Sequence, residues 1–199
     1  MYSRFQLAKK YLQYYFTASN GKGHGIHSPF VFDFIEKVLN DKKEYSCYSI
    51  IEQQRKLLLT DKSVIEVEDF GAGSAVIKTR QRVVKDIAAS SLKPAKFSKL
   101  LFRIVNYYNP KAILELGTSF GITSAYLASG NADSKLYTCE GAKNIAAIAR
   151  QTFNNLNIKN IDLVEGDFAA GSRVRSTAGQ PSRPVRWPCG KRLRLRRSV

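Results

Sequence analysis

The sequence has 199 residues, of which 44% are hydrophobic, and this composition suits one globular domain, or two at most, with a core of its own. The formal net charge of +16 at pH 7 raises the question of a nucleic-acid partner. No apolar run approaches the roughly 18 residues of a membrane helix, and no signal peptide is expected.

The first part of the chain, residues 1–109, is predicted to be a helical region. Residues 3–17 carry a basic amphipathic stripe that we expect to pack on the domain or on a partner subunit, with a membrane surface as the alternative. A Gly-rich segment then ends at Ser28-Pro29, a cap followed by proline at the first helical position, which predicts a helix over 29–40. The remaining expected elements are helices over 46–59, 79–90 and 94–109, the last beside the sheet, and a short strand or extended loop within 64–70.

No metal site is predicted from the residues that most often bind metals. The three cysteines, Cys47, Cys139 and Cys189, lie far apart, which favours the reducing cytoplasm over a disulfide framework or a zinc site. The two histidines, His24 and His27, share a Gly-rich loop without a third ligand nearby. We expect them to cap or to pack, and a role as general base is the alternative.

The stretch 111–129, KAILELGTSFGITSAYLAS, is the most informative part of the sequence. Its apolar residues lead through Glu115 to Gly117, and helical spacing begins after Gly121. A buried strand, a turn with glycines and a helix are typical of a parallel sheet that is covered on both faces. Glycine lets a backbone approach a ligand closely. We therefore interpret this turn as the nucleotide-binding corner of a doubly wound α/β sheet.

Two further strands are predicted after this corner, and each ends in an acidic residue. Residues 135–140 end in Glu140, which lies 25 residues after Glu115 and so one strand further in a βαβ unit. A carboxylate at that place can accept hydrogen bonds from both ribose hydroxyls of an adenosine. Residues 160–168 form the third expected strand, with Asp167 at its end.

The glycine spacing separates the classes of nucleotide site. Gly117 and Gly121 are four residues apart, whereas the dinucleotide fingerprint requires G-x-G-x-x-G. Thr118 and Ser119 stand where its crowded central glycine would fall, and no Gly-Lys-Ser/Thr follows to form a P-loop. An NAD-dependent oxidoreductase is therefore disfavoured, and a P-loop is excluded.

The three strand ends resemble motifs I, II and III of the class I S-adenosylmethionine-dependent methyltransferases. The similarity is greatest to O-methyltransferase-like members that act on small molecules, which share I-L-E-L-G-T-S-x-G in motif I. The upstream segments 20–35 and 69–74 look like an uncharacterised bacterial branch of that superfamily. The resemblance thus covers about residues 1–168.

The resemblance implies an α/β fold, a Rossmann-like methyltransferase sheet with a helical N-terminal region, in which residues 110–168 are the first half of the core. It implies S-adenosyl-L-methionine as cofactor and methyl transfer to a small-molecule acceptor, with oxygen as the nucleophile. No catalytic residue is assigned, because related enzymes supply the base or metal from later strands. The implied cofactor contacts are Glu115, Gly117, Ser119 and Gly121 along the methionine part, with Thr118 among them, Glu140 at the ribose, and Asp167 and Phe168 beside the adenine.

Each implied site residue also has a purely structural alternative. Gly117 and Gly121 could form an ordinary strand-to-helix turn. Glu140 could be a solvated acid near the positive end of the next helix dipole. Asp167 follows Gly166, and Gly-Asp is common in turns. The sequence does not indicate the acceptor or the oligomeric state.

The sequence changes character after Phe168. Residues 169–199 hold eight Arg, one Lys and no acid, whereas residues 1–168 carry 23 basic and 16 acidic side chains. We expect this tail to be non-native sequence, as after a frameshift. The sheet would then end after its third strand, with an apolar edge left unpaired, and we expect the enzyme to be impaired. The alternative is a basic nucleic-acid-binding protein that uses the Arg-rich tail as a disordered arm.

Overall fold

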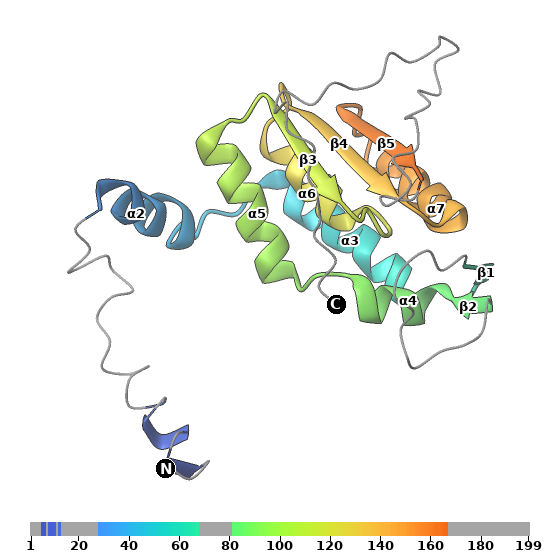
Figure 1. The fold of residues 1–199 in the computed structure, drawn as a ribbon, viewed down its shortest axis with the longest axis horizontal. Coiled ribbons are helices and arrows are strands. Elements are labelled where there is room, and N and C mark those ends of the chain that lie inside the picture. Colours follow the sequence, from blue (N-terminus) through green and yellow to red (C-terminus); the bar gives the residue numbers. More distant parts are fainter. Residues whose placement is uncertain (1–4, 7, 11, 13–27, 68–80, 167–199) are drawn as a thin grey trace, which may run out of the picture.

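The computed structural model describes residues 5, 6, 8–10, 12, 28–67 and 81–166 (Figure 1). The described residues between 5 and 12 are helical, in agreement with the helix expected over 3–17. The expectations that lie outside the described residues concern His24, His27, the segment 69–74, Asp167, Phe168 and the tail 169–199.

Three expected helices are confirmed before the sheet begins. The helix expected over 29–40 consists of α2 (Pro29–Phe34) and a π-helical turn, η2 (Ile35–Leu39), in which Asn40 N–H donates to the Ile35 carbonyl at 2.9 Å. Helix α3 (Ser46–Thr60) matches the expected 46–59. Helix α5 (Ala95–Tyr108) follows Pro94 and ends at Asn109, whose left-handed φ of 45° stops it.

The helix expected over 79–90 is wrong at its start. Gln81–Val83 form strand β2, which pairs antiparallel with β1 (Val64–Glu66), and helix α4 spans only Val84–Ser91. The pairing sets Ile65 opposite Arg82. Strand β2 therefore depends on a partner that is distant in the sequence and that local periodicity does not reveal. The strand expected within 64–70 is confirmed by β1.

The second half of the described chain forms a parallel sheet. Strands β3 (Ala112–Leu116), β4 (Lys135–Glu140) and β5 (Ile161–Glu165) lie in the order β3-β4-β5. Helix α6 (Ile122–Gly130) connects the first two strands, and helix α7 (Lys143–Asn155) connects the last two. This βαβαβ unit is one half of a Rossmann-like sheet, and it confirms the predicted α/β fold class.

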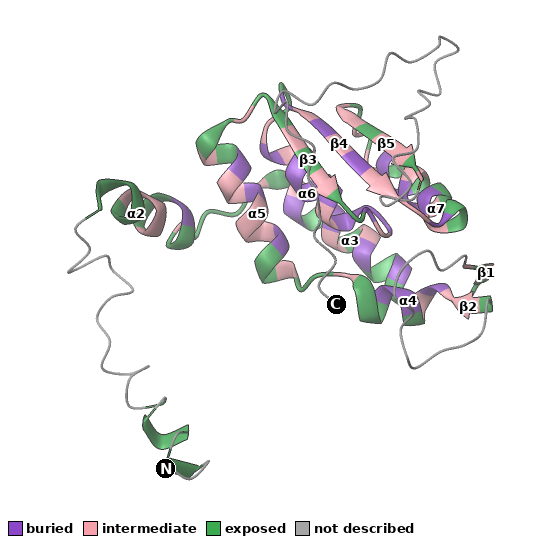
Figure 2. Ribbon diagram, in the orientation of Figure 1, coloured by how far each residue is buried: buried purple, intermediate pink, exposed green. Residues whose placement is uncertain are grey.

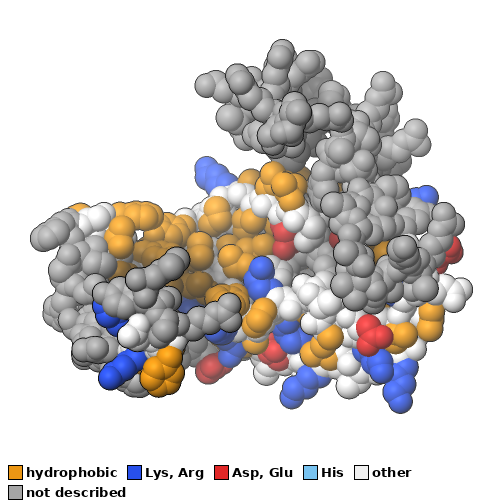
Figure 3. Space-filling view, turned by 60° about the horizontal axis from the view of Figure 1, so that its bottom comes forward, with side chains coloured by type: hydrophobic (Ala, Val, Ile, Leu, Met, Phe, Trp, Pro, Cys, Tyr) orange, Lys and Arg blue, Asp and Glu red, His pale blue; other side chains and the backbone are white. Residues whose placement is uncertain are grey.

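The described helices around this sheet lie on one of its faces. Helices α6 and α7 lie behind the strands in Figure 1, α5 packs on α6, and α3 packs on α6 and α4. Paired residues of parallel strands point to the same face, so Ile113, Leu136 and Ile161 all face the helices. The opposite face carries Leu114 and Leu116, which are 49% and 68% exposed (Figure 2). Figure 3 shows hydrophobic side chains gathered over part of the surface.

Aromatic side chains fill the core between the helices. Tyr126 and Phe120, from the helix and turn after β3, are fully buried. The ring of Tyr48 on α3 packs edge-on against that of Phe102 on α5, with centroids 5.1 Å apart. Residues from both parts of the chain thus share one core, and α5 packs beside the sheet as expected, because Val105 clusters with Leu136. None of the described helices is long and apolar enough to cross a membrane.

Candidate functional site

The structure brings the candidate residues of β3 and β4 to one edge of the sheet. Gly117 and Thr118 follow β3 directly, and both of their N–H groups donate to the Cys139 carbonyl at 3.0 Å. Glu140, the next residue, ends β4. The carboxyl ends of the two strands are therefore joined to the turn after β3. The predicted contacts that lie in this corner are Glu115, Gly117, Thr118, Ser119, Gly121 and Glu140.

The carboxylate of Glu140 is held by two backbone N–H groups. Ser119 N–H donates to Oε2 at 2.8 Å from the turn after β3, and Ala142 N–H donates to Oε1 at 3.1 Å from the start of α7. Each oxygen accepts one of these bonds, whereas an ionised carboxylate offers about four acceptor positions. Glu140 can thus accept further hydrogen bonds without giving up its protein partners.

Glu115 is a half-buried carboxylate on the helix-covered face of β3. Ser124 Oγ on α6 and Thr138 Oγ1 on β4 both donate to its Oε2, the second at 2.8 Å. Its Oε1 accepts no hydrogen bond from the described part of the chain. Burial raises the pKa of Glu115, and the two hydrogen bonds and the Lys93 charge act in the opposite direction. A cationic donor placed at Oε1 would therefore stabilise the carboxylate.

Gly117 and Gly121 both have left-handed backbone conformations, but their surroundings differ. Gly117 has a φ of 92°, and an added Cβ would meet nothing within 4 Å. Gly121 has a φ of 80°, and an added Cβ would lie 2.5 Å from Cε1 of Phe153 on α7. Gly117 thus leaves open space beside the turn, whereas Gly121 allows α6 and α7 to pack closely.

Three groups of this corner were not expected from the sequence, namely Ser124, Thr138 and the Ala142 N–H. Thr138 Oγ1 lies 2.7 Å from Thr118 Oγ1, so it links the buried Thr118 to Glu115. Thr138 lies two residues before Glu140 and so on the same face of β4. Strand alternation could have identified Thr138, whereas no sequence signal marks a backbone N–H.

The geometry also supports a purely structural role for Glu140. Glu140 lies beside the N-cap residue of α7, where the helix dipole favours a negative charge. It also joins the turn after β3 to that helix through Ser119. Glu140 therefore stabilises this corner without a ligand. Among the residues that the structure describes, no group of three potential metal-ligating side chains comes together.

No family model and no curated protein matches the chain. Similar solved structures include an O-methyltransferase from Bacillus cereus in complex with SAH, with 20% identity, a TM-score of 0.42, and coverage of 71% of this chain and 51% of that chain. An SAH-bound methyltransferase from Podospora anserina has 12% identity, a TM-score of 0.46 and coverages of 86% and 54%. The SAM-bound O-methyltransferase TomG from Streptomyces achromogenes, involved in tomaymycin synthesis, has 21% identity, a TM-score of 0.40 and coverages of 64% and 46%. The chain spans about half the length of these solved structures.

Proposed function

We propose that the corner formed by the ends of β3 and β4 binds S-adenosyl-L-methionine, and that the protein acts as a methyltransferase. The observation that carries the proposal is the Glu140 carboxylate, which two backbone N–H groups hold in place while further acceptor positions stay available. A ribose presents two neighbouring hydroxyl donors. A fixed carboxylate at the end of the second strand suits them.

The second carboxylate suits the amino-acid end of the same ligand. That end carries an ammonium group, and Glu115 Oε1 has no hydrogen-bond partner among the described residues. Because burial raises the pKa of Glu115, a cation beside it would offset the cost of its desolvation. Gly117, in the turn after β3, leaves open space on the side where such a ligand would lie. The donors and acceptors of the corner therefore fit the cofactor.

When bound, S-adenosyl-L-methionine supplies a methyl group on a positively charged sulfur. The residues of this chain would bind and orient the cofactor and exclude water from it, because an in-line displacement depends mainly on alignment. In this assignment Asp167 and Phe168 border the adenine, on the strength of the sequence resemblance. The residues assigned to the methionine part are Glu115, Gly117, Thr118, Ser119 and Gly121.

We propose an oxygen atom of a small molecule as the methyl acceptor, on the basis of the same resemblance. A hydroxyl acceptor must lose its proton to a base or near a metal ion. We assign no residue of the described corner to that role. The proposed location is the cytoplasm, in line with the free thiols of Cys47 and Cys139.

A dinucleotide such as NAD is the competing ligand class, and Ser119 favours S-adenosyl-L-methionine over it. Ser119 stands at the central glycine of the dinucleotide fingerprint and has a left-handed φ of 50°. Its Oγ lies 3.0 Å from Ser91 Oγ. A side chain at this position hinders the close approach of a pyrophosphate to the backbone.

Calorimetric titration of S-adenosyl-L-methionine and, separately, of NAD tests the proposal. We expect saturable binding of the first and no binding of the second at matched concentrations. Glu140→Gln should weaken the binding by at least about tenfold, because one acceptor oxygen becomes a donor. Glu44→Gln removes an exposed carboxylate of the surface pair with Lys99 and is the matched control. It should leave the affinity within about twofold.

Each outcome has a definite meaning when circular dichroism shows that the variants are folded. If Glu140→Gln left the binding of S-adenosyl-L-methionine unchanged, the ligand would not lie at the end of β4. Binding of NAD in preference to S-adenosyl-L-methionine would refute the proposed cofactor. A folded wild-type chain that binds neither ligand would refute the cofactor site itself.

A further inference from the structure

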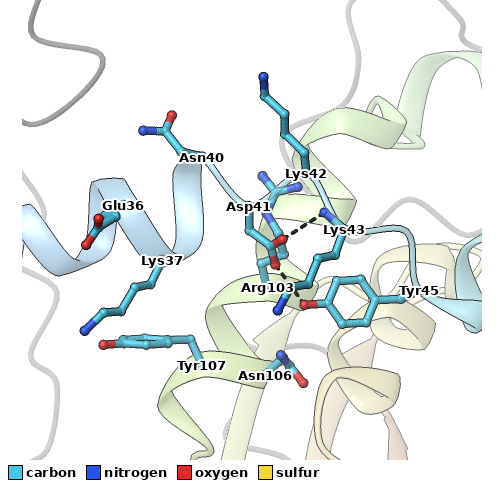
Figure 4. A pocket seen from close by; sticks show the side chains of 10 residues that line it. All are labelled: Glu36, Lys37, Asn40, Asp41, Lys42, Lys43, Tyr45, Arg103, Asn106 and Tyr107. Carbon is cyan, nitrogen blue, oxygen red and sulfur yellow. Dashed lines mark hydrogen bonds between the residues drawn. The ribbon is translucent and has the colours of Figure 1, made fainter.

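A concave site lies between η2, the turn that follows it, and α5 (Figure 4). Its cavity has a volume of about 710 Å³ and is lined by residues between 36 and 45 and between 103 and 107. This volume falls in the range of about 300–1,000 Å³ that is usual for small-molecule sites. Helix α5 leads into the amino end of β3, whereas Glu115 and Glu140 lie toward the carboxyl ends of β3 and β4.

Positive charge predominates in this cavity. The charged side chains of the lining are Lys37, Lys42, Lys43 and Arg103 against Glu36 and Asp41. Lys37 is paired with Asp33 at 2.9 Å. Lys42 and Lys43 form no ion pair with the residues that the structure describes. Lys42 and Lys43 thus stand outside the ion pairs, while the nearby Asp41 carboxylate offsets part of the charge of Lys43 and Arg103.

Arg103 is the cation with the most defined position. Its side chain is half-buried, and its Nε donates to the Val38 carbonyl at 2.8 Å. Its two Nη groups make no hydrogen bond to the described part of the chain. A guanidinium that is anchored at Nε presents its remaining N–H donors in a fixed plane. Such a plane matches the oxygens of phosphate or carboxylate.

Asp41 stabilises the turn on which Lys43 lies. Asp41 Oδ1 accepts the Lys43 N–H at 2.8 Å, and Oδ2 accepts the Tyr45 hydroxyl at 2.8 Å. Desolvation raises the pKa of Asp41, but these two bonds and the charges of Lys43 and Arg103 lower it below its usual value. Asp41 therefore stays ionised at neutral pH with a protein donor on each oxygen. Figure 4 shows the Lys43 side chain alongside Tyr45.

The other walls suit an organic group. The ring of Tyr107 on α5 lines the cavity, with Lys37 Nζ 6.0 Å from its centroid. Glu36 and Lys37 of the π-helical turn η2 also line the cavity. Turns of this type are rare and frequently occur at functional sites.

We propose that this cavity binds a small organic phosphate, with its phosphate group at Arg103 and Lys43 and its organic part against Tyr107. The excess of cations in the lining suits an anionic group. The volume exceeds what an inorganic phosphate alone would fill, and the aromatic wall provides a contact for the remainder of the molecule. None of its lining residues belongs to the proposed cofactor corner.

Phenyl phosphate and inorganic phosphate, titrated separately at constant ionic strength, test the proposal. We expect phenyl phosphate to bind at least about tenfold more tightly, because only its ring can contact Tyr107. Lys43→Gln and Arg103→Lys should each weaken that binding by about tenfold or more, since a charge-assisted or bidentate contact is lost. Lys56→Gln, which removes an exposed charge on α3, is the matched control and should change it by less than about twofold.

Three results would overturn the proposal. A folded protein that binds neither compound would remove the site. If Lys43→Gln and Lys56→Gln weakened the binding of phenyl phosphate equally, the binding would depend on the overall positive charge and not on this cavity. Equal affinities for the two compounds would refute the proposed contact between the organic group and Tyr107. In contrast, a shift of the Arg103 Nε–H resonance on addition of phenyl phosphate, with unchanged binding of S-adenosyl-L-methionine in Lys43→Gln, would support a separate site.

Discussion

Replacement of Gly121 by alanine should destabilise the protein more than the same replacement at Gly117. Both residues have left-handed φ values, 80° and 92°, and a Cβ in that region costs about 1–2 kcal/mol. Only at Gly121 would the new Cβ meet other side chains, 2.5 Å from Cε1 and 2.8 Å from Cζ of Phe153 and 3.4 Å from Cβ of Ala149. The difference between the two variants therefore isolates the effect of packing between α6 and α7.

The magnitude follows from the geometry. A separation of 2.5 Å is well inside the contact distance of about 3.5–4.0 Å between carbon atoms. The Phe153 ring, which is only 6% exposed, must shift together with α7. Overpacking of this kind costs about 1–3 kcal/mol. We expect the free energy of unfolding to fall by about 2–5 kcal/mol in Gly121→Ala and by about 1–2 kcal/mol in Gly117→Ala.

Urea denaturation followed by circular dichroism measures both losses. Phe153→Leu removes the ring atoms that the new Cβ would meet. The double variant with Gly121→Ala should therefore show a favourable coupling of about 1–2 kcal/mol in a double-mutant cycle. Titration of S-adenosyl-L-methionine gives an independent comparison. Gly117→Ala should weaken that binding despite its smaller effect on stability, because its methyl group would enter the open space beside the turn.

Equal losses of stability in the two alanine variants would refute the packing argument, and so would a cycle without coupling. Cofactor binding that is unaffected by Gly117→Ala would refute the position of the ligand beside this turn. The two refutations are separate, because the first concerns only the contact between α6 and α7.

Three further predictions concern charge and exposure. Burial raises the pKa of Glu115, so the stability linked to this group is present below the unfolded pKa of a carboxyl and is lost as pH rises through the folded pKa. Thermal melts of Glu115→Gln should therefore show a raised Tm at neutral pH and no gain near about pH 4. Arg55→Met should lower the free energy of unfolding by about 3 kcal/mol in urea titrations, because the half-buried Glu52 would lose its ion pair. Leu116→Thr should change stability by less than about 0.5 kcal/mol, since the side chain is 68% exposed, and should reduce binding of a hydrophobic dye.

The sheet could be predicted from the sequence because its signals are local. An apolar run that ends at a glycine marks β3, and the acid at its end marks β4. Strand β2 could not be predicted, because Gln81–Val83 become a strand only by pairing with β1. The π-helical turn η2 could not be predicted either, since its apolar spacing continues that of α2. Pairing and helix register are set by tertiary contacts rather than by propensity.

The candidate site could be predicted as positions but not as a network. Glu115 and Glu140 stand out because acids at the ends of buried strands are unusual. The partners of Glu140 are the backbone N–H groups of Ser119 and Ala142, and every residue except proline has such a group. The cationic cavity at α5 could not be predicted, because Lys43 and Arg103 are distant in the sequence and line the same cavity only through the packing of α5.

The two carboxylates of the corner lie on neighbouring strands, and their environments differ. Glu140 accepts a backbone N–H on each oxygen, so it joins the turn after β3 to the start of α7. Glu115 is desolvated with one oxygen left without a described partner, so its charge opposes folding. In the proposed cofactor site, a positive group bound at Oε1 would recover that cost as binding energy.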